Sequence, residues 1–173
     1  MFRRVLGSRF AWLAIGLLGG ILLSGLLPTT PIHAVATDRI DTFAIATGPV
    51  DGEFEAVYFL DFLTGDLRAM VLGKNATVDG FTAFFNGNVL QDLGVDPTKN
   101  PRFLMVTGMA NLRRGGAQLQ PSSAVVYVAE VTTGNVAAYA IPWSPPLHAA
   151  NRPMMQPLVR VAVSKFRAAA ARE

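Results

Sequence analysis

The sequence predicts an α+β domain dominated by β-strands, built from internally duplicated strand-hairpin-strand-helix units with pseudo-twofold symmetry and preceded by one N-terminal apolar helix. Two observations support this prediction. A β-branched and aromatic run broken by Thr-Gly occurs across 57–72 and again across 126–141, which is typical of a β-hairpin. A shorter pattern, Phe-x-apolar-apolar-Thr-Gly, precedes each hairpin, at 43–48 and at 103–108. We therefore expect one domain over 37–173 with two equivalent halves.

Residues 1–36 form a leader separate from that domain. Three arginines, at positions 3, 4 and 9, precede a charge-free stretch over 10–27, which as a helix is roughly 27 Å long, close to the thickness of the hydrocarbon core. The arginines favour a cytoplasmic N-terminus and a body on the extracytoplasmic (periplasmic) side of the inner membrane. The length favours a retained single-pass anchor. The small-x-small pattern at 34–36 favours the alternative, a signal peptide cleaved after Ala36 that leaves a periplasmic or secreted body.

Composition restricts the function classes. The net charge of +3 comes from the leader, since residues 37–173 hold twelve basic and twelve acidic side chains, so we expect no nucleic-acid partner. The halves differ: 37–98 hold three basic and ten acidic residues (−7), whereas 99–173 hold nine and two (+7). These charges attract, either within the domain or between molecules, which favours self-association or docking to an envelope protein. With no cysteine, thiol chemistry is excluded.

In the first half, the strand over 43–48 ends at Gly48-Pro49 and is followed by the hairpin. A further strand is expected over 81–85. Asn86 is the predicted N-cap of a short helix over 89–93, which ends at Gly94. This half ends at residue 98.

In the second half, an exposed loop is expected within 111–123 and a proline-rich excursion over 142–157. A strand over 158–163 then leads to an alanine-rich helix over 165–172. Both faces of the strand over 57–62 are largely apolar, which predicts burial on both sides, with the helices covering an outer face of the sheets. A pair of β-propeller blades is the competing architecture; because two blades cannot close a ring, it would require oligomerisation.

Asp61 and Glu130 occupy equivalent positions, three residues before each Thr-Gly turn. Two carboxylates that meet near a pseudo-twofold axis could bind a cation or act as acid and base. An acid at this spacing more often accepts hydrogen bonds from its own turn, and that interpretation is favoured.

His148 is the histidine of the body, because His33 belongs to the leader. It lies in a proline-rich loop with no neighbouring acid to orient it, which does not favour catalysis. The sequence has no phosphate-binding glycine loop, zincin helix or nucleophile elbow. We therefore predict no catalytic, cofactor-binding or metal-binding residue and no cofactor. The sequence favours a binding protein over an enzyme. Asp61, Glu130 and His148 are kept as the candidates for a site.

The phrases at 31–39, 56–67 and 124–135 resemble a group of small exported or membrane-anchored proteins of planctomycete bacteria that have no assigned activity. The resemblance covers the whole chain and implies an envelope protein of a bacterium with extensive internal membranes. The leading hypothesis is a non-enzymatic envelope protein, tethered to or exported across the inner membrane, whose duplicated domain mediates self-association or protein contacts. The alternative is an extracytoplasmic domain that binds a small molecule or cation, or is an enzyme, through the paired acids.

Overall fold

The computed structural model describes residues 9–24, 37–74, 80–112 and 120–167, which belong to two compact units. The first unit contains the helix α1, Arg9–Ser24. No helix within the described ranges combines the length and the apolar character needed to span a membrane. The predicted helix over 10–27 is described only as far as residue 24, and the predicted cleavage pattern at 34–36 lies outside the described residues.

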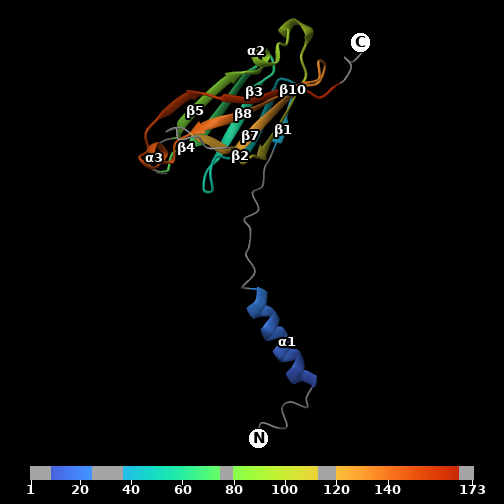
Figure 1. Cartoon of the computed structure of the whole chain (residues 1–173), viewed down its shortest axis with the longest axis vertical. Coiled ribbons are helices and arrows are strands. Elements are labelled where there is room, and N and C mark those ends of the chain that lie inside the picture. Colours follow the sequence, from blue (N-terminus) through green and yellow to red (C-terminus); the bar gives the residue numbers. More distant parts are fainter. Residues whose placement is uncertain (1–8, 25–36, 75–79, 113–119, 168–173) are drawn as a thin grey trace. The chain divides into compact units, whose positions relative to one another are not determined.

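The second unit is the β-rich body, which Figure 1 shows as two layers of strands with short helices at their ends. The prediction of a β-dominated α+β fold is confirmed. The strands of this unit are β1 Thr37–Arg39, β2 Phe43–Pro49, β3 Glu55–Asp61, β4 Asp66–Leu72, β5 Phe81–Asn88, β6 Phe103–Met109, β7 Gln120–Glu130, β8 Asn135–Trp143, β9 Met154–Pro157 and β10 Val159–Lys165. The short helices are α2 Val89–Leu93, the 3-10 helix η2 Pro97–Lys99 and α3 Pro145–Ala149.

Sheet A has the strand order β1-β2-β3-β4-β5-β9, and sheet B has the order β10-β8-β7-β6. Every neighbouring pair is antiparallel except β5 and β9, which are parallel. Each sheet therefore contains an antiparallel group of four strands laid down in chain order, β2 to β5 in sheet A and β6, β7, β8 and β10 in sheet B. The chain enters sheet B between β5 and β6, returns to sheet A at β9, and crosses to sheet B again at Leu158, between β9 and β10.

The core lies between the sheets. The inner face of sheet A contributes Tyr58 and Leu60, and the inner face of sheet B contributes Phe103, Val128 and Tyr139, all almost without accessible surface. The opposite side chains are half-buried or exposed, so that β3 alternates between buried and half-buried positions. The prediction that the strand over 57–62 is buried on both sides is therefore wrong, since Val57, Phe59 and Asp61 on its outer face are only half-buried.

The sheets do not pack through equivalent faces. Phe43 pairs with Asp61 in sheet A, and Phe103 pairs with Glu130 in sheet B, so these positions correspond. Asp61 lies on the outer face of sheet A, whereas Glu130 is fully buried on the inner face of sheet B. A twofold axis between packed sheets would bring the same face of each into contact. The observed packing differs from the predicted pseudo-twofold arrangement in this respect.

The helix α2 packs on β4 of one sheet and β8 of the other, with its apolar side chains in the core. The prediction that the helices cover an outer face is wrong for α2. Gly94 ends it in the left-handed conformation, with a φ of 63°, as expected. Its N-cap is Asn88 rather than Asn86, because β5 continues pairing with β4 as far as Asn88.

The second half departs further from the prediction. β7 already begins at Gln120, inside the segment expected to be a loop, and residues 113–119 of that segment lie outside the described ranges. The proline-rich excursion contains α3 and β9, neither of which was predicted. The prediction of a helix over 165–172 is wrong where it can be compared, since Lys165 still belongs to β10 and Phe166 and Arg167 are in no helix; residues 168–172 lie outside the described ranges.

Candidate functional site

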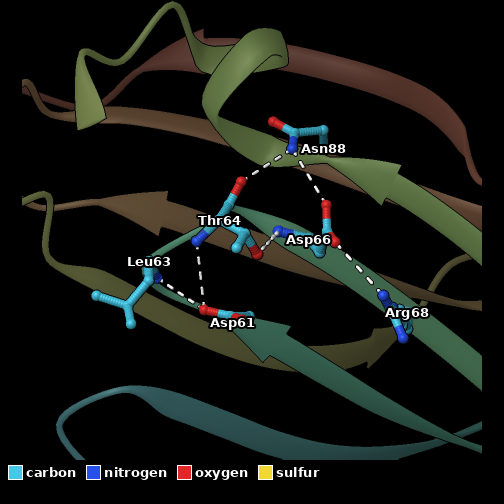
Figure 2. Close-up of polar contacts among 6 residues, drawn as sticks. All are labelled: Asp61, Leu63, Thr64, Asp66, Arg68 and Asn88. Atoms are coloured by element: carbon cyan, nitrogen blue, oxygen red, sulfur yellow. Dashed lines mark hydrogen bonds and ion pairs between the residues drawn. The ribbon is translucent and has the colours of Figure 1, made fainter.

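Asp61 ends β3 and organises the β3–β4 turn (Figure 2). Its Oδ1 accepts hydrogen bonds from the backbone N–H groups of Leu63 at 2.8 Å and Thr64 at 3.3 Å, and its backbone carbonyl accepts from Gly65. Gly65 has a φ of 71°, which glycine adopts without the steric cost that a Cβ brings. The favoured prediction for Asp61, that it binds its own turn, is confirmed.

Asp66 carries the polar contacts on the other side of the same turn. Its carboxylate accepts from the Asn88 amide at 3.3 Å and lies 3.5 Å from the Arg68 guanidinium (Figure 2). The same amide nitrogen also donates to the carbonyl of Thr64. Asn88 therefore joins the turn to the start of α2, while Arg68 lies on the outer face of sheet A.

Glu130 ends β7 and organises the β7–β8 turn in the same way. Its carboxylate accepts from the backbone N–H groups of Thr132 at 2.9 Å, Thr133 at 2.6 Å and Arg102 at 3.2 Å, and from the Thr133 hydroxyl at 2.6 Å. Gly134 takes the position of Gly65, with a φ of 74°. The favoured prediction is confirmed here also.

The electrostatics of Glu130 follow from these contacts. Burial alone would raise its pKa, but the hydrogen bonds from Thr133, Thr132 and Arg102 favour the charged form and outweigh burial, so the pKa lies below the usual value of 4.5. A buried carboxylate whose oxygens are held by four donors stabilises its turn. It is poorly placed to accept a proton from a substrate.

His148 lies in α3 rather than in a loop and is 2% exposed. Its Nε2 lies 2.9 Å from the carbonyl oxygen of Leu72, and since a carbonyl can only accept, Nε2 carries the proton. Its ring packs edge-on against Phe54, with centroids 4.3 Å apart, and at a tilt against Trp143, with centroids 4.8 Å apart. His148 thus fixes α3 to the end of β4. His148 is also among the residues that line a hollow of about 230 Å³, together with Lys74.

The three candidates do not form one site among the described residues. Asp61 lines a hollow of about 390 Å³ on the outer face of sheet A, Glu130 is buried, and His148 lines a different hollow at the end of β4. Within the described ranges, no hydrogen bond or ion pair joins any two of them, and no three His, Asp or Glu side chains converge as metal ligands would.

The outer face of sheet A is a large apolar surface. Ile45 is 40% exposed and Phe84 41%, and Val57, Phe59 and Met70 lie between them in adjacent strands. Two hollows of about 390 and 480 Å³ lie on this face and share Arg68 and Met70 in their walls. A contiguous apolar surface of this kind is typical of a binding face.

The outer face of sheet B is also apolar. Leu104 is 48% exposed, Val106 54% and Tyr127 38%, and Val159 is exposed on β10, whereas Val125, Ala138 and Ala140 of the same face are buried. The two outer faces are a candidate binding surface that was not predicted from the sequence. The signal was present in the apolar residues on both sides of each strand, which we interpreted as burial inside one chain.

Comparison with known proteins gives no assignment: no family model, curated protein or solved structure matches this chain. Functional inference therefore rests on the geometry described above.

Proposed function

We propose that the protein is a non-enzymatic component of the cell envelope whose β-rich body, made of two copies of a strand-hairpin-strand unit, associates with protein through its outer sheet faces. The N-terminal segment tethers the body to the inner membrane or directs its export. The observation that carries the proposal is the apolar outer face on each of the two sheets. Water-exposed apolar surfaces on both sides of a two-layer body are unfavourable unless a partner covers them.

The duplicated unit is supported by the correspondence between the turns. Phe62 donates its backbone N–H to the carbonyl of Thr42 at 2.9 Å, and Val131 donates to Arg102 at 2.8 Å. In both sheets the acid, the turn glycine and the strand that precedes the hairpin, β2 or β6, occur at the same positions relative to these two bonds.

Photo-crosslinking in the cells that express the full chain tests the association. A photoreactive phenylalanine analogue at Phe43 or at Leu104 should give adducts of discrete mass, because each position lies on an outer face. The matched control carries the same analogue at Gln91, an exposed position on α2. Equal labelling at all three positions, or none at any, would contradict the proposal.

The envelope location has its own test. Alkaline carbonate should leave a tethered chain in the membrane pellet and release an exported, cleaved one. In spheroplasts, external protease should digest the body in the tethered case. A body protected from protease until the inner membrane is broken would show that the orientation is wrong.

A further inference from the structure

The first three strands of the two four-stranded groups share one hydrogen-bond register. Each pair between β2 and β3 recurs between β6 and β7: Gly48 pairs with Ala56, and Gly108 pairs with Val125. The agreement extends to the outermost strands, since Val89 donates to the carbonyl of Gly65 at 2.8 Å and Phe166 donates to that of Gly134 at 2.8 Å. Each residue of β2, β3 and β4 that pairs in this register therefore has a defined counterpart in sheet B.

This correspondence shows which inner face each outer face resembles. Inside the chain, sheet B uses the face that contains Phe103, Val126 and Glu130 to pack on the face of sheet A that contains Tyr58 and Leu60. The inner face of sheet B corresponds in register to the outer face of sheet A. The inner face of sheet A corresponds to the outer face of sheet B. The chain thus leaves part of each counterpart face exposed, with Phe43, Ile45 and Phe84 on sheet A and Leu104, Val106 and Tyr127 on sheet B.

We infer that a second copy of this chain covers these surfaces, with the outer face of sheet A of one copy packed on the outer face of sheet B of the next. This inference rests on the proposed association function and names its partner. The interface is heterologous, because two different surfaces meet, and each copy offers one of each.

The side chains at corresponding positions agree with this packing. Phe43 on the outer face of sheet A corresponds to the buried Phe103, and Val57 corresponds to the buried Val126. On the outer face of sheet B, Tyr127 corresponds to the buried Tyr58. Surfaces of this composition already pack in the core of the body.

Charge favours the head-to-tail arrangement over a symmetric one. Sheet A belongs mostly to the half with a charge of −7, and sheet B to the half with +7. At the turn end, the outer face of sheet A carries Asp61 and Asp66, whereas Arg167 lies beside Gly134 at the same end of sheet B. Contact between two sheet A faces would bring like charges together, and contact between sheets A and B brings opposite charges together.

The splay between the sheets indicates a closed ring. At one side β2 and β6 are in contact, and the Thr107 hydroxyl donates to the carbonyl of Thr47 at 2.5 Å. Further out, α2 fills the space between β4 and β8. Two sheets that are close at one edge and separated at the other are rotated relative to each other about an axis near the close edge. If successive copies pack with the same rotation, they form a closed ring around that axis. Since propellers close with about four to eight blades, we expect about two to four copies of this two-sheet chain.

Two single substitutions test this geometry on the full-length chain in a mild detergent. Ile45→Asp changes the outer face of sheet A, Val106→Asp changes that of sheet B, and Gln91→Asp on the exposed side of α2 is the control with the same added charge. Sedimentation at a detergent-matched density gives the protein mass. Wild type and Gln91→Asp should be rings, while each face variant alone should associate at least about 100-fold more weakly, because a carboxylate would be buried without a partner.

The decisive measurement is the mixture of the two face variants. Ile45→Asp retains an intact sheet B face and Val106→Asp an intact sheet A face, so an equal mixture should form a one-to-one dimer. A symmetric interface predicts instead that only one variant dissociates and that mixing restores nothing, which would overturn the inference. A monomeric wild type, or face variants that remain rings, would overturn it as well. None of these outcomes affects the crosslinking test of the proposed function, which detects other protein partners separately.

Discussion

The β3–β4 and β7–β8 turns have the same construction and opposite surroundings. In both, an acid accepts hydrogen bonds from the two residues before a left-handed glycine. Asp61 is partly exposed on an outer face, whereas Glu130 has no accessible surface and accepts a further bond from Arg102. The difference shows that one local motif can serve on a surface or in a core, depending on which face of its sheet is covered.

The largest expected effect comes from removing the buried acid. Glu130→Ala leaves the donors of Arg102, Thr132 and Thr133 without their acceptor, and we expect a loss of about 3 kcal/mol in the free energy of unfolding. Asp61→Ala should lose about 1 kcal/mol, because water can reach the freed donors. Urea denaturation of both variants measures the difference, and equal losses would show that burial does not distinguish the turns.

The turn glycines provide the next comparison. A Cβ on Gly65 would lie 2.5 Å from Leu90 Cγ, and one on Gly134 would lie 2.5 Å from Arg167 Cβ, both with positive φ. Leu90 is held in the core on α2, whereas Arg167 follows the edge strand β10 and can move. We expect Gly65→Ala to cost about 2 kcal/mol and Gly134→Ala about 1 kcal/mol. Thermal unfolding of the two variants would contradict this explanation if the order were reversed.

The acid dependence of stability should also separate the turns. Because the folded-state pKa of Glu130 is below its unfolded value of 4.5, its contribution is complete above that value and is lost as the pH falls through the folded pKa. As the pH falls below about 4.5, the free energy of unfolding of Glu130→Gln should therefore decrease less than that of wild type, by on the order of 1 kcal/mol. Urea titrations at several pH values measure this, with Glu55→Gln, an exposed carboxylate, as the control. Parallel curves for wild type and Glu130→Gln would contradict it.

The smallest effect is expected at the corresponding tyrosines. The Tyr58 hydroxyl is buried with no hydrogen-bond partner among the described residues, and burial raises its pKa above the usual 10.0. Removing such a hydroxyl is neutral or stabilising, so Tyr58→Phe should change stability by between 0 and about +1 kcal/mol. Tyr127→Phe, on the outer face of sheet B, is the control and should be neutral in the monomer. A clear loss in Tyr58→Phe would indicate a partner for that hydroxyl.

The predictions are most accurate for elements that are fixed by interactions between residues close in sequence. The Thr-Gly turns and the strands before them follow from glycine conformation and from carboxylates that bind nearby N–H groups. Helix α2 was predicted with its N-cap two residues too early, because strand pairing with β4 extends β5 to Asn88. β9 was missed because its parallel pairing with β5 joins residues about seventy positions apart, and no local pattern indicates it.

The sequence by itself determined the hairpins, the acid in each turn, the unequal charges of the two halves and the apolar character of both faces of the strands. Only the tertiary structure decided how each face is packed, and hence that Asp61 is partly exposed and Glu130 is buried. The physical reason is the period of two along a strand: when both alternating sets are apolar, local hydrophobicity favours neither face. The choice is then made by the packing of one sheet on the other.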